Sequence, residues 1–165
     1  MALLNVIKWD EDILRQKTVD VDLPPTPELK KLAFDMIQTM ETLNGVGLST
    51  PQINRTEKMF VMRMKNTMAI VINPVIRRVG EKVVSHEEGC LSLPGVTVNV
   101  PRPKFIWVDY YDAAGRLHSN VKLAKVEARI FQHEFDHLKG VLIVDYVKDE
   151  ITAYPELSSV HDSHI

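Results

Sequence analysis

The sequence predicts a single α+β domain in which antiparallel strands pack around a central helix, with one further helix in the N-terminal half. Three observations predict this fold. The chain has 165 residues, the length of one ordinary domain. Runs rich in β-branched and aromatic residues, separated by turn residues, fill its middle. Two segments in which apolar residues recur at helical spacing flank those runs.

The first helix is expected to follow a proline-rich connection at residues 19–28. Thr26 can cap the helix and Pro27 can be its first residue, because proline already has a helical φ. Asn44-Gly45 ends the helix, and residues 45–53, GVGLSTPQI, are expected to form a loop. The apolar residues that recur at spacings of three and four are Leu29, Leu32, Ala33, Met36, Ile37, Met40 and Leu43.

Six strands are expected between the two helices. Pro74 should place part of its run at a sheet edge or a bulge, because proline cannot donate a backbone hydrogen bond. Residues 112–115, DAAG, have the composition of a hairpin turn. The expected strands cover residues 58–64, 69–78, 81–87, 96–100, 105–111 and 116–123.

The second helix is expected over residues 124–139, with Gly140 as its stop. Its apolar side chains surround most of the helix, which is typical of a buried helix. An apolar segment follows at residues 141–147, and the last 18 residues are polar. We therefore expect a folded domain over residues 1–147 and a short tail over residues 148–165.

Composition and charge exclude several classes of protein. Hydrophobic residues are 45% and charged residues 25% of the chain, as in ordinary soluble domains. The net charge of −2 provides no bulk positive field for nucleic acid. No apolar run approaches the roughly 20 residues that span a bilayer, and MALLNVIKWDEDILRQ lacks the features of a targeting peptide. The single cysteine fits a reducing compartment, so we expect a cytoplasmic protein. We also expect a monomer.

His133, Glu134 and His137 form an H-E-x-x-H sequence in the second predicted helix. A spacing of four residues puts both imidazoles on one helix face, where they can share a metal ion. Glu134 can take a proton from a water molecule whose pKa the metal lowers. This pattern predicts that the central helix bears a metal. The alternative is a helix with two partly buried, hydrogen-bonded histidines.

A third metal ligand must come from elsewhere, because a catalytic site usually has three protein ligands and one open position. Residues 138–146, LKGVLIVDY, contain no histidine or glutamate at the spacing of H-E-x-x-H-x-x-G-x-x-H proteases. Cys90 lies in EGCLS, residues 88–92, before the turn Pro94-Gly95. A thiolate is a strong ligand for a borderline metal. The alternative for Cys90 is a small buried hydrophobic side chain.

Three segments together resemble peptide deformylase: GVGLSTPQ (45–52), EGCLS (88–92) and QHEFDH (132–137). The resemblance covers residues 5 to about 147. It implies a metal-dependent hydrolase that removes the formyl group from the N-terminal formyl-methionine of nascent polypeptides and releases formate. The order and separations of the three segments match the family. Three further matches are Leu14-Arg15, Ile72-Asn73-Pro74 and Val100-Pro101-Arg102.

The resemblance implies one divalent ion held by Cys90, His133 and His137, with water in the fourth position. Many members of the family use ferrous iron, and zinc forms are common. A cysteine and two histidines suit both metals. We expect Fe²⁺ as the physiological ion, with Zn²⁺ as the alternative.

The resemblance also implies the catalytic roles. Glu134 takes the proton of the water that attacks the formyl carbon and later delivers it to the leaving amine. The side-chain amide of Gln52 and the backbone N–H of Leu91 donate to the oxyanion. Without the other two motifs, Gln52 would be interpreted as a solvated loop amide.

Substrate contacts are implied at two places. Val46, Gly47 and Leu48 match the stretch that pairs its backbone with the substrate peptide. Val126 and Ile130, on the ligand face of the helix, are candidates for walls of the methionine pocket. Plain core packing is the alternative for Val126 and Ile130.

Several residues near these motifs leave alternatives open. Glu88 and Arg102 form either a buried pair beside the site or a surface ion pair. Asp136 either holds a ligand histidine or faces solvent. Ser49-Thr50 replaces the Ala-Ala most common in the first motif, and the family usually keeps an apolar residue at the position of Arg129.

Formyl-methionyl nascent peptides are the expected partners. Some bacterial members dock on the ribosome through a basic C-terminal helix, but the tail here has Lys148 as its only strong base, so a transient ribosome contact is not expected through the tail. A metalloprotease that cuts internal bonds is the rival enzyme, disfavoured by the missing downstream ligand. The other rival is a catalytically inactive, metal-stabilised peptide-binding module. Glu134 and Gln52 disfavour it, because binding alone needs no carboxylate that activates water.

Overall fold

The structure is a computed structural model that describes residues 3–147, and it confirms the predicted α+β class. Its two α-helices are α1 (Pro27–Thr42) and α2 (Lys125–Leu138). Three short 3-10 helices accompany them: η1 (Asp12–Arg15), η2 (Thr50–Ile53) and η3 (Ile143–Val147). The strands are β1 (Gly47–Ser49), β2 (Met59–Met64), β3 (Thr67–Val79), β4 (Val83–Cys90), β5 (Leu93–Pro103), β6 (Phe105–Tyr111) and β7 (Leu117–Ala124).

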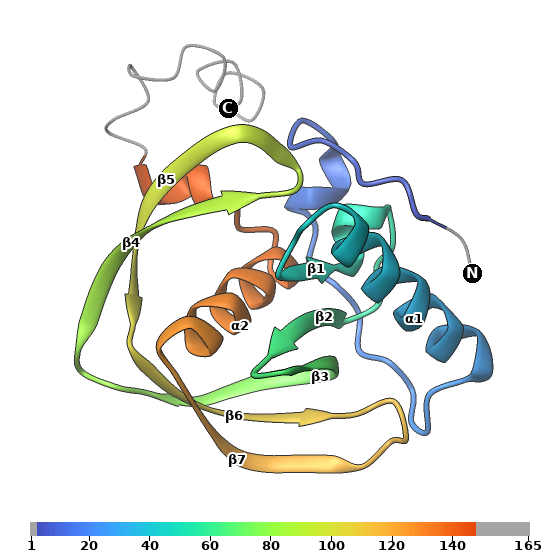
Figure 1. Ribbon diagram of the computed structural model, residues 1–165. Coiled ribbons are helices and arrows are strands. Elements are labelled where there is room, and N and C mark those ends of the chain that lie inside the picture. The colour runs from blue at the N-terminus through green and yellow to red at the C-terminus, as the bar shows by residue number, and fades with distance from the viewer. Residues whose placement is uncertain (1–2, 148–165) are drawn as a thin grey trace.

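The strands form two antiparallel sheets. Five strands pair in the order β1-β2-β3-β6-β7, and β4 pairs with β5 in a separate hairpin. Figure 1 shows α2 between the five-stranded sheet and this hairpin, while α1 lies beside β1 and β2. The strand β1 is therefore an edge strand whose residues lie close to both helices.

Helix α1 begins as the sequence predicts. The Thr26 hydroxyl accepts a hydrogen bond from the Leu29 N–H at 3.2 Å, and Pro27 is the first helical residue. Asn44 has a positive φ of 55° just beyond the helix, and the Gly45 N–H closes the last turn on the Met40 carbonyl. The buried face of α1 packs on one side of β2 and β3.

The strand β2 is buried on both faces, because a helix lies on each. Phe60 and Met62 pack toward α2, and Met59 and Val61 pack toward α1. Phe131 of α2 is fully buried and meets Phe60 edge to face, with ring centroids 5.1 Å apart. This apolar packing fixes α2 on the five-stranded sheet.

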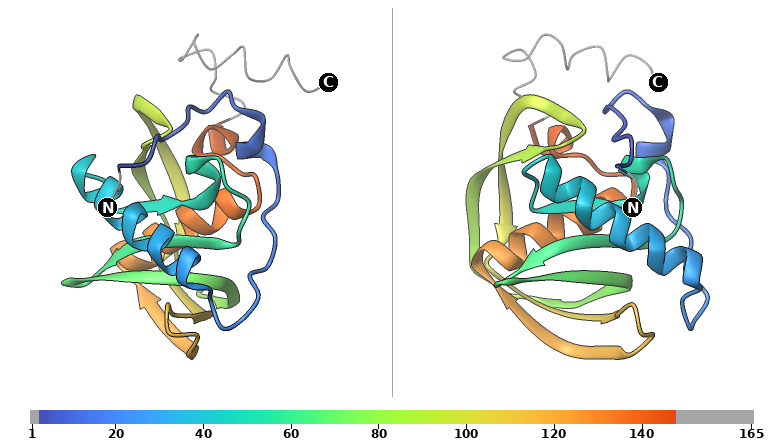
Figure 2. Two further views of the ribbon diagram at one scale, coloured as in Figure 1. Left: turned by 90° about the vertical axis from the view of Figure 1, so that its right-hand side faces the viewer. Right: turned by 45° about the vertical axis from the view of Figure 1, so that its right-hand side comes forward.

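The β4–β5 hairpin has an apolar cluster of its own. Leu93, Val98 and Val100 pack against η3 and against Leu14 of η1. Figure 2 shows η3 beside the hairpin. Cys90 lies at the margin of this cluster.

Some expected boundaries were wrong. Residues 45–53 are not simply a loop, since they contain β1 and η2. Cys90 is the last residue of β4 rather than a residue beyond it, and β5 begins at Leu93. Pro74 lies in the interior strand β3, where the pairing with β6 shifts register between Ile72 and Val75. A bulge therefore accommodates the proline.

The expected tail at residues 148–165 lies outside the described residues, so its boundary stays a prediction. The helices of residues 3–147 include none with the length and apolar character that crossing a bilayer requires.

Candidate metal centre and active site

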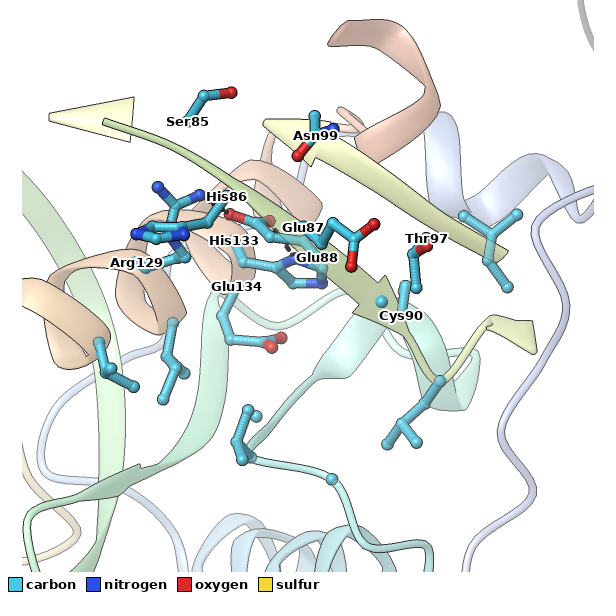
Figure 3. Close-up of a pocket in the computed structure, with 18 of the residues that line it drawn as sticks. Ser85, His86, Glu87, Glu88, Cys90, Thr97, Asn99, Arg129, His133 and Glu134 are labelled. Atoms are coloured by element: carbon cyan, nitrogen blue, oxygen red, sulfur yellow. Dashed lines mark hydrogen bonds and ion pairs between the residues drawn. The ribbon is translucent and has the colours of Figure 1, made fainter. Parts of the chain in front are cut away.

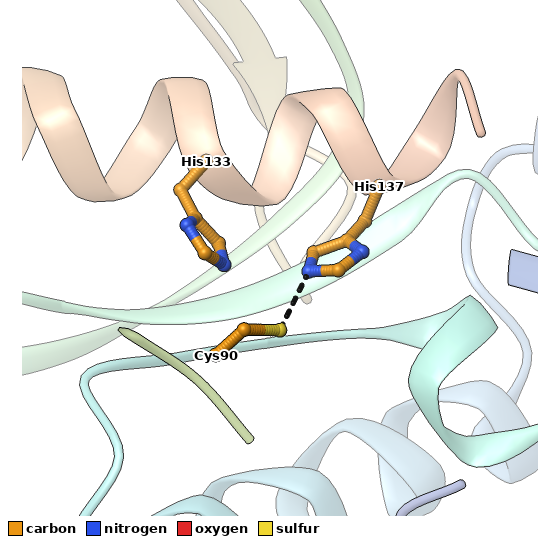
Figure 4. A group of neighbouring side chains, drawn as sticks. All are labelled: Cys90, His133 and His137. Atoms are coloured by element: carbon orange, nitrogen blue, oxygen red, sulfur yellow. Dashed lines mark hydrogen bonds between the residues drawn. The ribbon is translucent and has the colours of Figure 1, made fainter. Parts of the chain in front are cut away.

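The structure brings the three expected ligands together. Sγ of Cys90 and one ring nitrogen each of His133 and His137 lie within 4.8 Å of one another. Sγ is 3.4 Å from Nε2 of His137, and Figure 4 shows both imidazoles descending from α2 toward the sulfur. The four-residue spacing places the two ring centroids 5.0 Å apart.

The donor set fits a metal ion. Bonds of about 2.0–2.3 Å to nitrogen and sulfur allow one ion to reach all three donors. Nδ1 of His133 lies 2.9 Å from Oε2 of Glu88, which leaves Nε2 of that ring for the centre. His137 is buried, and its Nδ1 has no hydrogen-bond partner in the described part of the chain.

Glu88 is the carboxylate that orients His133. Its Oε1 accepts from Arg102 Nε at 2.6 Å and from Arg129 Nη1 at 2.6 Å, and its Oε2 accepts from Arg102 Nη2 at 2.9 Å. Burial alone would raise the pKa of Glu88, but the hydrogen bonds from His133 and Arg102 outweigh it and lower the pKa to about 2. Of the two alternatives for Glu88 and Arg102, the buried pair is the one observed.

Glu134 lies beside the ligands with its carboxylate in the pocket, as Figure 3 shows. The residue is 3% exposed, and its Oε2 has no hydrogen-bond partner within residues 3–147. Burial raises its pKa to about 7. A side chain at Gly47 would collide with this carboxylate, so glycine is needed where β1 passes Glu134.

Gln52 points its amide nitrogen at the centre. Its Oε1 accepts from both the N–H and the hydroxyl of Ser49, each at 2.9 Å. Its Nε2 is therefore directed toward Sγ of Cys90 at 3.5 Å and Oγ of Ser92 at 3.3 Å. Gln52 is 1% exposed, which rules out the solvated loop amide.

One pocket connects these groups to most of the expected substrate residues. Val46, Gly47 and Leu91 line it on one side, and Val126 and Ile130 line it on the α2 side. Val126 is 68% exposed, so plain core packing does not describe it, whereas Ile130 is 8% exposed and also belongs to the core around α2. The Leu48 side chain lies instead in the core beneath α1, and Leu48 pairs with Val61 in the sheet.

Comparison with known proteins supports this arrangement. The family model of polypeptide deformylase matches residues 3–152. A peptide deformylase from Picosynechococcus sp. is 37% identical over 152 residues, which cover 89% of this chain and 80% of that protein. The chain belongs to the polypeptide deformylase family.

Two solved structures of the family have the same fold. The Thermotoga maritima peptide deformylase superposes with a TM-score of 0.86 at 37% identity, over 90% of this chain and 99% of that one. The Synechococcus elongatus peptide deformylase, solved in complex with actinonin, gives 0.87 at 34% identity, over 96% and 86% of the two chains.

The departures from the common deformylase pattern have structural explanations. Ser49 supplies a hydroxyl that holds Gln52, and the Thr50 hydroxyl lies within hydrogen-bond distance of the Glu57 and Met59 carbonyls, either of which can accept its proton. Arg129 reaches away from the helix to Glu88 and to two strand carbonyls. Both sets of polar groups therefore have hydrogen-bond partners within the protein.

Asp136 does neither of the two things expected of it. It is buried, and its Oδ2 accepts from Arg102 Nη1 at 2.9 Å and from the Tyr146 hydroxyl at 2.6 Å. The sequence analysis gave no role to Tyr146 or to Ser92, although Ser92 is the last residue of the EGCLS motif. Neither has a spacing signal, since Tyr146 follows in η3 and Ser92 reaches Gln52 only through the fold.

Proposed function

We propose that this chain hydrolyses the formamide of N-formylmethionyl peptides and releases formate. Membership of the peptide deformylase family makes it a hydrolase. The observation that carries the proposal is a Cys/His/His donor set whose Cys90 and His133 line one pocket together with the buried carboxylate of Glu134 and the amide of Gln52. Formyl-methionyl nascent peptides are the substrate class.

Cys90, His133 and His137 would hold one divalent ion, which makes α2 the metal-bearing helix between the two sheets. A bound ion there supplies Lewis-acid activation of water and of the formyl carbonyl. One thiolate and two imidazoles suit Fe²⁺ and Zn²⁺. We take Fe²⁺ as the physiological ion and Zn²⁺ as the alternative.

The catalytic work of the chain falls to three groups. Glu134, which has a free oxygen facing the pocket, accepts the proton of the attacking water and passes it to the departing amine. The Gln52 amide donates to the developing oxyanion, and the Leu91 N–H is its proposed companion. Because Ser49 holds the Gln52 carbonyl, the amide needs no reorientation during the reaction.

The edge strand β1 is the proposed platform for the peptide. Its far edge does not pair with another strand of residues 3–147, so the backbone groups of the Val46–Leu48 stretch that face this edge can add a substrate strand. The Val46 carbonyl is not one of them, because it accepts from the Arg63 N–H at 2.8 Å. Val126 and Ile130 would contact the methionine side chain. The free thiol of Cys90 favours a reducing compartment such as the cytoplasm.

Formate release from formyl-Met-Ala-Ser by anaerobically purified protein tests the proposal. We expect turnover by the native chain with one equivalent of metal, and a loss of about 10²–10⁴-fold in Glu134→Ala. Glu41→Ala is the matched control, because Glu41 is a half-exposed carboxylate of α1 with a 3.9 Å contact to Arg63. Cleavage of internally blocked peptides without formate would instead support the metalloprotease.

A further inference from the structure

The metal ligands come from two elements that share no apolar core. Cys90 ends β4, whereas His133 and His137 belong to α2. Among residues 3–147, the apolar cluster around α2 contains no side chain of β4 or β5, and the cluster of β5 and η3 contains none of α2. The direct contacts between the hairpin and α2 are therefore polar, while η3, which follows α2 in the chain, adds an apolar contact with β5.

Arg129 makes three of these polar contacts. Its Nη1 donates to Glu88 Oε1 at 2.6 Å and to the Val100 carbonyl at 2.8 Å, and its Nη2 donates to the Val84 carbonyl at 2.6 Å. Val84 lies in β4 and Val100 in β5, so one guanidinium joins α2 to both strands. The Arg129 side chain is 16% exposed. Figure 3 shows Arg129, Glu88 and His133 gathered on the same side of β4.

The remaining contacts between α2 and the hairpin are fewer per residue. Arg102 donates to Asp136, His133 bonds Glu88, and Gln132 Nε2 donates to the Pro103 carbonyl at 3.0 Å. Sγ of Cys90 also lies 3.4 Å from Nε2 of His137. Arg102 and Arg129 share Oε1 of Glu88, and Arg102 and His133 share Oε2. A planar guanidinium can bond several acceptors in fixed directions, and a lysine ammonium cannot reproduce this arrangement.

We propose that Arg129 is a positioning residue: by joining α2 to Glu88 and to both strands of the hairpin, it holds Cys90 at the separation from His133 and His137 that a metal ion requires. This inference rests on the proposed function, since it concerns the same metal centre. Arg129 touches neither the ligand atoms nor the pocket's amide and carboxylate. Its effect passes through Glu88 and the strand backbone.

Chelator-driven release of Co²⁺ from the loaded protein tests this inference without relying on activity. We expect Arg129→Met to release Co²⁺ at least about 10-fold faster than the native chain and to alter the sulfur-to-metal absorption band of Cys90. We expect Arg129→Lys to fall between the two. Arg77→Met is the matched control, because Arg77 is 60% exposed and pairs with Asp109 on the other sheet.

Kinetic and stability measurements on the same variants distinguish a positioning role for Arg129 from that of a pocket wall or of a purely structural residue. We expect kcat for formyl-Met-Ala-Ser to fall in Arg129→Met while KM changes little. An Arg129→Met variant with the native Co²⁺ release rate and the native absorption band would overturn the inference. If that variant changed only KM, Arg129 would be a wall of the pocket. If it changed only the melting temperature of the metal-free protein, Arg129 would have a purely structural role. If Arg129→Met does not fold, Arg129→Lys decides by the same criteria. If the native chain itself binds no Co²⁺, the proposed function fails instead.

Discussion

The five-stranded sheet and the β4–β5 hairpin lie on opposite sides of α2, and they are joined to it by different interactions. The sheet meets α2 through apolar side chains, with Phe60 against Phe131 at its centre. The hairpin meets α2 through a buried polar network around Glu88, Arg102 and Asp136. The hydrophobic effect is roughly proportional to buried area and has no direction, whereas charged hydrogen bonds fix direction and distance. The part of the molecule that must place a single sulfur atom is the part held by charges.

Removing the sulfur should have the largest effect, because it takes one metal ligand from the hairpin. We expect Cys90→Ala to lose the metal, to lose formate release to background, and to be less stable than the loaded native chain, since metal binding is linked to folding. Elemental analysis and thermal unfolding measure both effects. Retention of one tightly bound equivalent of metal by this variant would contradict the ligand assignment.

The second-largest effect should come from a variant that crowds Glu134 from the side of the five-stranded sheet. A Cβ at position 47 would collide with the Glu134 carboxylate, so Gly47→Ala should displace it and lower kcat/KM by about 10²-fold while one equivalent of metal stays bound. Gly89→Ala is the comparison at a second glycine of the pocket lining, because its Cβ would have its nearest neighbour, the Val96 carbonyl oxygen, at 3.9 Å. Equal rates in the two variants would show that Glu134 does not need its present position.

The two attachments of α2 can be separated by one variant of each kind. Phe131→Ala should destabilise the protein by about 3–5 kcal/mol through a cavity. Arg102→Met should cost a similar amount, about 3–5 kcal/mol, because it removes the guanidinium that pairs with both Glu88 and Asp136, two buried carboxylates. Only Arg102→Met should also weaken metal binding in the folded protein. Urea unfolding of the metal-free variants and Zn²⁺ competition titration of the folded ones provide the two measurements.

The comparison also explains what the sequence could and could not predict. Helices α1 and α2 were predicted because their apolar residues have a helical period, and the two histidines were predicted as ligands because residues four apart share a helix face. Cys90 joined the predicted set through the resemblance to peptide deformylase. The edge strand β1 was missed, since a three-residue strand with Gly47 and Ser49 shows no alternation. The role of Arg129 was unpredictable, because its acceptors are two backbone carbonyls and a carboxylate at least 29 residues away in the chain.

The smallest expected effect is an acid-sensitive contact at the far turn of the five-stranded sheet. Asp112 accepts from the N–H groups of Ala114 and Arg116 and lies 2.9 Å from Nε2 of His118. Burial raises its pKa, but the His118 bond and these N–H bonds outweigh burial and lower the pKa to about 2. A lowered pKa means that the stabilisation is complete above the ordinary carboxyl range and is lost as the pH falls toward about 2.

Asp112→Asn should therefore lower the melting temperature of the metal-free protein by a few degrees at pH 6, and the difference from the native chain should shrink between about pH 4 and pH 2. Asp10→Asn is the control, because Asp10 is exposed and has no ion pair within residues 3–147. Formate release at neutral pH should not change in either variant, since the turn is remote from the pocket lining. A difference that stays constant down to pH 2 would show that the Asp112 contacts do not depend on its charge. The five-stranded sheet would then be held without any charged contribution at this turn, which would sharpen its contrast with the hairpin.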